Sequence, residues 1–320
     1  MIRKPPDLIP SCFRTSLPLV ESAALAILFC SIAGLTVCGA PQNSQAPAAS
    51  GQTADAAAPE VRRLSARTLR TFPAPEADQG VAADGRHFYA VDNSQIAKYE
   101  IASGRRVAEW AGPPNGLIRH MNSCLADRGR LWCANSNYSQ TPMGSSVEIF
   151  DTASLAHVDS HSLGMLDEGS LTWFDRYRDG WIAGFAHYDK TGGVPFKDHR
   201  FSSVVTFDAE WRRTGGWLFP PTTLERMAPY AASGGALGPD GWLYLLGHDR
   251  PEMYVVARPS MGPVLIHIAT IDLEAEGQAF AWAQDGSRTV FTVDRKKGLV
   301  RMIEIPAVQP ADPAVSLKFR

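Results

Sequence analysis

A hairpin pattern that recurs five times constrains the fold of this chain more than any other feature of its sequence. An Asp or Arg followed by glycine marks each turn, at Gly85, Gly129, Gly180, Gly241 and Gly286. An apolar strand such as Val290–Val293 follows each turn, and Asp-Gly between two such runs is typical of a β-hairpin. The turn glycines are 44, 51, 61 and 45 residues apart, a period typical of repeated four-stranded units.

Further apolar runs follow each hairpin where a third and a fourth strand are needed, as in Val147–Phe150 and Val107–Trp110. No helical pattern separates them, and Pro220–Tyr230 is predicted to be a loop. The sequence therefore predicts an all-β fold, a five-bladed β-propeller over residues 61–306 followed by a C-terminal tail, 307–320. A sixth blade within the 61-residue interval and a two-layer sandwich are the alternatives.

The last repeat lacks a fourth strand, whereas the run Leu69–Phe72 has no repeat of its own. Pairing the two would close the ring and leave no exposed sheet edge. Trp173, Trp181, Trp242 and Trp282 fall inside predicted strands, where they are expected to pack between blades.

The N-terminus has the pattern of an export signal over residues 1–38. Basic residues precede an uncharged apolar run, Ala23–Val37, which is shorter than the ~20 residues that span a bilayer. Leu35-Thr-Val-Cys38 resembles a bacterial lipobox, which implies a membrane tether through a lipidated Cys38. Residues 39–60 are rich in Ala, Gln, Ser and Pro and are expected to form a disordered tether. An uncleaved N-terminal anchor is the alternative; an exported protein, periplasmic, extracellular or lipid-anchored, is expected.

The bulk composition excludes several classes of partner. A formal net charge of −2 offers no general attraction to nucleic acid, and 45% hydrophobic with 20% charged residues is typical of a soluble globular domain. A monomer acting on a small polar molecule is expected.

Two cysteines fall within the predicted propeller. A two-residue turn at Arg128-Gly129 places Cys124 opposite Cys133 on the paired strand, close enough for the disulfide that an oxidising compartment permits. Two buried free thiols are the alternative.

Propeller topology brings the start of each inner strand and the end of each second strand to one mouth of the central channel. Polar residues recur at these points, and a cluster of this kind suits a small polar substrate or a divalent cation. The predicted substrate-binding residues are Gln79, Asp92, His120, Asn137, His199, His248 and Arg295. His199 ends an inserted loop, 187–200, that springs from this mouth. Polar caps of strand ends are the alternative interpretation.

Glu168-Gly-Ser-Leu-Thr-Trp173 resembles the metal-binding strand start of the gluconolactonase-like propellers, and residues 277–294 resemble that family's hairpin ending on a catalytic Asp. The resemblance implies a divalent metal bound by Glu168 or Glu276, with Asn122 and Asn135 as candidates for the family's paired Asn ligands, and Asp294 as the general base. The carboxylates, amides and histidines at the mouth would suit one ion of Ca, Mg, Mn or Zn. His187 and Glu168 are further catalytic candidates in this sequence.

Gln79-Gly80 and Glu168-Gly169 also resemble the five-bladed glutaminyl cyclotransferases, and the chain as a whole resembles exported propellers described as cycloisomerases. These resemblances imply ring-opening or ring-closing chemistry of the lactonase, cyclase or cycloisomerase type. A non-catalytic propeller that binds protein or glycan at the cell surface is the alternative. Glu276 and Asp294, at the two ends of the last hairpin, are expected to face the same mouth.

Overall fold

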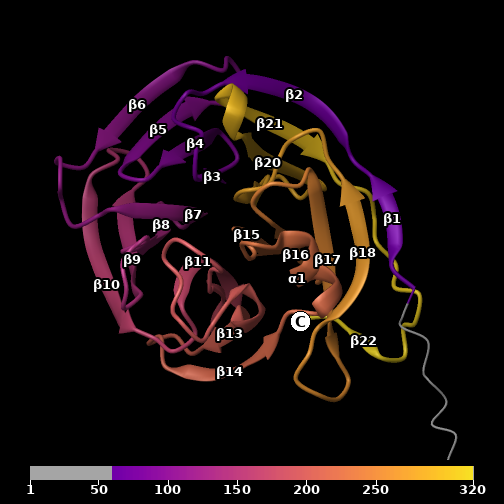
Figure 1. Cartoon of the computed structure of the whole chain (residues 1–320). Helices are drawn as coiled ribbons and strands as arrows, with labels where there is room; N and C mark the ends of the chain where they lie inside the picture. The colour runs from indigo at the N-terminus through magenta and orange to yellow at the C-terminus, as the bar shows by residue number, and fades with distance from the viewer. Residues whose placement is uncertain (1–59, 320) are drawn as a thin grey trace, which may run out of the picture. The chain divides into compact units, whose positions relative to one another are not determined.

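The computed structural model describes residues 60–319, and the predicted export signal, Cys38 and nearly all of the predicted tether lie outside these residues. The described residues form five sheets arranged around a central axis (Figure 1). Each sheet is antiparallel through its four blade strands, with the first strand of the repeat innermost. The prediction of an all-β, five-bladed propeller is therefore confirmed.

The blades follow the chain in order. Blade one comprises β3 (Gly80–Ala83), β4 (His87–Asp92), β5 (Gln95–Glu100) and β6 (Arg106–Ala111). Blade two comprises β7 (His120–Asp127), β8 (Arg130–Ser136), β9 (Gly144–Asp151) and β10 (His157–Met165). Blade three comprises β11 (Ser170–Tyr177), β12 (Gly180–Ala186), β13 (Ser203–Phe207) and β14 (Arg213–Leu218). Blade four comprises β15 (Gly234–Leu237), β16 (Leu243–Leu246), β17 (Glu252–Pro259) and β18 (Ile266–Asp272), and blade five comprises β19 (Phe280–Trp282), β20 (Thr289–Asp294), β21 (Leu299–Glu304) and β2 (Arg67–Pro73).

An N-terminal strand closes the ring, as predicted. Strand β2 pairs antiparallel with β21, from Arg67 opposite Glu304 to Pro73 opposite Leu299. Phe72 is buried at this closure, and its ring centroid lies 4.9 Å from that of Phe88 in blade one. The closure is thus both hydrogen-bonded within blade five and packed against the neighbouring blade.

Blade four gains two strands that the repeat pattern does not contain. Strand β1 (Arg62–Ser65) pairs in parallel with the outer strand β18, and β22 (Ser316–Leu317) pairs with the end of β17. Phe319 follows β22 and is buried against Tyr177 and Trp217 of blade three. The C-terminal tail is therefore packed onto the propeller.

The inner hairpins have the predicted turns, with one local difference. Gly286 follows Asp285 at φ 78°, a left-handed conformation that glycine adopts without steric cost. In blade three the left-handed residue is Arg178 at φ 54°, two positions earlier than the predicted Gly180. A Cβ on Gly180 would lie 2.1 Å from the carbonyl oxygen of Phe207, so close packing against β13 requires glycine there.

The structure also confirms two predictions about side-chain packing, for the pair Cys124 and Cys133 and for Trp173. Cys124 and Cys133 face each other across β7 and β8 and form a disulfide. Trp173 is fully buried, and a Cβ on Gly235 of the next blade's inner strand would lie 2.4 Å from its ring. This close approach of an inner strand to a tryptophan shows that Trp173 packs between blades three and four.

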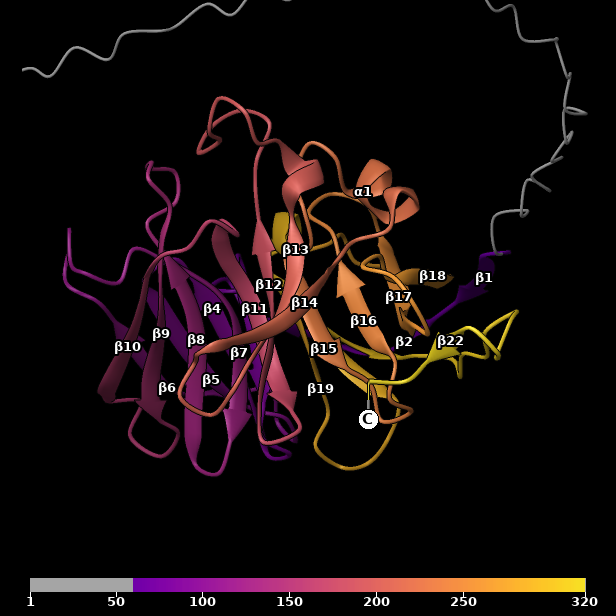
Figure 2. The same ribbon diagram turned by 90° about the horizontal axis from the view of Figure 1, so that it is seen from below.

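The prediction of a loop over Pro220–Tyr230 is wrong, because this segment contains helix α1 (Pro221–Met227). Pro221 occupies the first helical position, where its missing N–H costs nothing, and Leu224 and Met227 bury the same face of the helix. Helix α1 and the β12–β13 loop project from the same side of the ring (Figure 2). No helix in residues 60–319 is long and apolar enough to cross a membrane.

Candidate functional site

A polar cavity of about 220 Å³ lies at the mouth of the channel, where inner strands begin and second strands end. Its walls come from all five blades and from the connection between α1 and β15. The lining residues are Gln79, His120, Asn122, Tyr138, Thr172, Ala186, Tyr188, Tyr230, Ala231, Ala232, Ser233, His248, Gln278 and Arg295. The structure thus gathers Gln79, His120, Asn122, His248 and Arg295, which sequence reasoning had selected, into one cavity.

His120, the first residue of β7, is held by an amide from blade one. Its Nδ1 lies 2.5 Å from Oδ1 of Asn93, whose own Nδ2 donates to Asp92 at 2.7 Å. The amide orientation therefore makes Asn93 the acceptor and places the proton of neutral His120 on Nδ1. Burial, together with the positive charge of Arg295, lowers the pKa of His120 to about 4. Neutral His120 therefore has an unprotonated Nε2, and the residue lines the cavity.

Arg295, directly after β20, is fixed by partners from two other blades. Its Nε donates to Oδ1 of Asp78 at 2.7 Å, and its Nη1 donates to Nε2 of His248 at 3.1 Å. Because a guanidinium only donates, Nε2 of His248 is the acceptor, and the proton of His248 is on Nδ1, 2.5 Å from Oδ1 of Asp249. These hydrogen bonds with Asp78 and His248 fix the guanidinium of Arg295 in the cavity lining.

Three tyrosines that sequence reasoning missed supply the aromatic walls. The Tyr138 ring lies 4.9 Å from the rings of both His120 and Tyr188, and the Tyr230 ring stacks on His248 at 4.1 Å between centroids. Tyr138, Tyr188 and His248 each stand two residues after the end of a second strand. This shared position is the signal that could have identified both Tyr138 and Tyr188.

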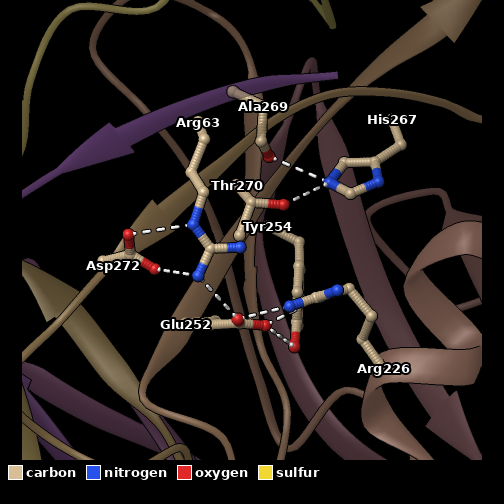
Figure 3. Close-up of polar contacts among 8 residues, drawn as sticks. All are labelled: Arg63, Arg226, Glu252, Tyr254, His267, Ala269, Thr270 and Asp272. Carbon is tan, nitrogen blue, oxygen red and sulfur yellow. Dashed lines mark hydrogen bonds and ion pairs between the residues drawn. The ribbon is translucent and has the colours of Figure 1, made fainter. Parts of the chain in front are cut away.

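Tyr230 is positioned through α1, and α1 is attached to blade four by a buried carboxylate (Figure 3). Glu252 accepts hydrogen bonds from both Arg226 of α1 and Tyr254, and also from Arg63 of β1. Burial pushes the pKa of Glu252 upward, but the hydrogen bonds and charge of Arg226, with Tyr254 and Arg63, hold it below the ordinary value. Glu252 therefore holds both strand β1 and helix α1, the helix that leads to Tyr230 in the cavity wall.

A neutral buried histidine makes a second attachment for α1. Nε2 of His267 lies 3.0 Å from the carbonyl oxygen of Ala269, and its Nδ1 lies 3.1 Å from the hydroxyl of Thr222 in α1. Burial lowers the pKa of His267 to about 4, so the ring remains neutral and can accept from Thr222.

The three carboxylates expected to act together do not form one site. Glu168 is paired with Arg213 at 2.6 Å, Glu276 with Lys296 at 2.7 Å, and Asp294 with Arg301 at 2.8 Å. None of the three lines the cavity, and none belongs to a described group of acidic, His or Cys side chains able to share an ion. Glu276 stands before β19 and Asp294 ends β20, at the positions expected for the channel mouth, but each side chain pairs with its own cation.

Other predicted residues support the cavity or lie apart from it. Asn135 accepts from the backbone N–H groups of Arg119 and His120, so its amide oxygen is engaged by protein. Asp92 holds Asn93. Asn137 closes its own loop through Gly144 and Pro142.

His187, predicted to be catalytic, is 4% exposed, and its ring packs against Phe201 outside the cavity lining. Its Nε2 lies 3.2 Å from the carbonyl oxygen of Asp167. Burial lowers the pKa of His187, so the ring is a neutral core histidine.

One described group has three side chains close enough to share a metal ion: Asp189, Asp198 and His199, in the inserted loop and its 3₁₀ turn. Nδ1 of His199 lies 2.7 Å from Asp189. Arg200 binds both oxygens of Asp198, and its hydrogen bonds lower the pKa of that carboxyl to about 2. The group lies outside the cavity lining.

The described residues thus form a five-bladed β-propeller with a polar cavity at the mouth of its channel. No family model matches the chain, and no curated protein matches it in sequence. Among solved structures it is similar to glutaminyl cyclase of Myxococcus xanthus, with a TM-score of 0.50 and 13% identity over 79% of this chain and 100% of that one. The RRP9 WD40 repeats give a TM-score of 0.39 and 10% identity over 78% of this chain and 100% of theirs.

The similarity to the glutaminyl cyclase structure shows the fold, a β-propeller, which has five blades here. At 13% identity it carries no substrate to this chain.

Proposed function

We propose that this propeller is a cyclase-type enzyme that closes or opens a ring in a small polar molecule bound in the central cavity. The observation that carries the proposal is His120, a neutral imidazole that lines the cavity and whose Nδ1 is tied to Asn93, which leaves Nε2 unprotonated. An oriented histidine of this kind is the group that most often moves protons in enzymes.

The reaction would use His120 as the proton carrier. As an intramolecular N–H or O–H group attacks a carbonyl carbon, Nε2 of His120 accepts its proton. When the bond to the leaving group breaks, that group receives the proton from His120. One bond forms, one breaks, and the enzyme returns to its neutral state.

The similarity to a glutaminyl cyclase makes ring closure of an N-terminal glutamine the first reaction to examine, with lactone opening as the second. Export of the protein remains part of the proposal, and the disulfide between Cys124 and Cys133 supports an oxidising compartment.

A divalent metal would have Asp189, Asp198 and His199 as its ligands among the described residues. The donor set does not fit well, because Arg200 occupies both oxygens of Asp198 and would have to be displaced. We therefore derive no catalytic step through a metal.

The test is turnover by the purified protein of a glutaminyl dipeptide, followed by ammonia release, and of γ- and δ-lactones, followed by proton release. We expect one of these to be turned over and H120Q to lower kcat/KM by about 10²-fold or more, the contribution typical of general-base catalysis. H161Q, on the exposed outer strand β10, is the matched control and should retain full activity. The proposal is wrong if none of these compounds is turned over, or if H120Q is as active as the parent.

A further inference from the structure

Arg295 is the only one of the fourteen cavity-lining residues that carries a formal charge. The remaining lining residues are neutral polar groups, aromatic rings, alanines and the two histidines. The tautomer of each histidine is fixed in its neutral form, His120 by Asn93 and His248 by Arg295. A guanidinium in the lining favours an anionic ligand over a cationic one, and Asp78, its ion-pair partner at 2.7 Å, is not part of the lining.

Part of the guanidinium remains available to a ligand. Nε is engaged by Asp78 and Nη1 by His248, whereas Nη2 donates to no group among residues 60–319. Planar N–H donors of arginine match the two oxygens of a carboxylate better than they match a single carbonyl.

Two nearby acids are not part of the cavity lining. Asp78 uses Oδ1 for Arg295 and Oδ2 for the side chain of Gln79, and Asp249 uses Oδ1 for His248. Asp78 therefore holds the guanidinium of Arg295 in place, and Asp249 holds the imidazole of His248.

The cavity also limits the size and shape of the ligand. A volume of about 220 Å³ is below the ~300–1,000 Å³ of typical ligand pockets, so the ligand is compact. The rings of Tyr138, Tyr188 and Tyr230 offer flat walls, and Nε2 of His120 accepts a hydrogen bond from an N–H or O–H group.

From these features we infer that the molecule bound in the cavity is a small, flat carboxylate. Its carboxylate pairs with Arg295, its body lies against the tyrosine rings, and an N–H or O–H group faces His120. His248 is a positioning residue that fixes the guanidinium. The inference deepens the proposed function, since it assigns a substrate class to the same cavity.

Benzoate and benzamide separate charge from shape, because the two are nearly isosteric. Calorimetric or ligand-observed NMR titrations would compare them on the full-length protein, R295Q, R295K and K296Q. Lys296 is the adjacent residue, exposed and paired with Glu276 outside the cavity, so K296Q removes a neighbouring positive charge as a control. Near-ultraviolet circular dichroism would establish that each variant is folded.

We expect benzoate to bind the parent and K296Q at least about tenfold more tightly than benzamide, as a charge-assisted pair predicts. R295Q should abolish this preference. R295K, which keeps the charge but loses the planar fork, should retain a smaller preference and thus support the assignment even if R295Q is poorly folded. Equal binding of both probes, undiminished benzoate binding by R295Q, or no benzoate binding to the parent at millimolar concentration would overturn the inference.

The outcome is distinguishable from that of the proposed function. Arg295-dependent binding of benzoate without any turnover of the ring substrates keeps the carboxylate site and rejects the cyclase. Turnover that needs His120 but shows no preference for a carboxylate keeps the cyclase and rejects the carboxylate site.

Discussion

The side chain of Asn93 in blade one accepts a hydrogen bond from Nδ1 of His120 in blade two, at 2.5 Å. Asn93 acts as the acceptor there, because its donation from Nδ2 to Asp92 orients the amide so that Oδ1 faces His120. A contact between blades therefore sets the tautomer of the proposed general base.

Replacing Asn93 with Ala should lower kcat about tenfold or more with little change in KM, because His120 loses the partner that fixes its proton and its orientation. The ¹⁵N chemical shifts of His120 should show a mixture of tautomers in this variant. Q95A, which removes an exposed amide two residues away, serves as the control and should leave both rate and tautomer unchanged. An N93A protein with unaltered kcat would show that the contact has no part in catalysis.

Protein stability should fall as the pH drops from 6.5 toward 4.5, before most carboxylates titrate. Burial lowers the pKa values of His120 and His267 to about 4 in the folded state, whereas the unfolded chain titrates near 6.5. The unfolded state thus binds more protons in this window, and stability present above pH 6.5 is lost at up to about 1.4 kcal/mol per pH unit for each histidine.

Urea denaturation at pH 7, 5.5 and 4.5 measures this dependence. H267Q should show a shallower decline than the parent, whereas H161Q on the surface should keep the full slope. A parent protein equally stable at pH 7 and 4.5 would contradict the burial of two neutral histidines.

Binding of a carboxylate in the cavity should raise the pKa of His120. After burial, the charge of Arg295 is the next cause of its low value, and a bound anion would offset that charge. NMR titration of the His120 ring should therefore give a higher pKa with benzoate than with benzamide. The same titration curve with both compounds would mean that the anion does not bind beside Arg295.

Replacing Glu252 with Gln should destabilise the protein by about 3 kcal/mol, because Arg226 and Arg63 lose a shared buried carboxylate. D272N breaks a more exposed partner of Arg63 and should cost no more than about 1 kcal/mol. Chemical denaturation gives both free energies of unfolding. E252Q should also weaken benzoate binding, because α1 positions Tyr230 against His248. Equal losses of unfolding free energy in E252Q and D272N would show that Glu252 is no more important than an exposed ion-pair partner.

The sequence was sufficient for the blade count, the closing strand and the pairing of Cys124 with Cys133, because all three depend on strand period and register. It also selected five cavity residues, including His120 and Arg295, since propeller topology fixes where strand ends meet. It could not reveal that Glu168 faces Arg213, because the two lie on opposite edges of blade three and the loops between them have no fixed geometry in the sequence.

Tyr230 is a cavity residue that could not be predicted from the sequence. Its place in the cavity depends on α1, a seven-residue helix held by Arg226 and Thr222, and such a short helix has little propensity of its own. Tertiary contacts decide its position, and these are not readable from local sequence.

The strand that closes the ring also orders events during synthesis. Strand β2 is made near the start of the chain, but its partner β21 comes more than two hundred residues later, with Arg67 and Glu304 separated by 237 positions. Blade five therefore cannot assemble until β21 has been synthesised, after the blade strands β3 to β18. Loss of either β2 or β21 would leave this one blade incomplete, so closure of the ring depends on two distant parts of the sequence.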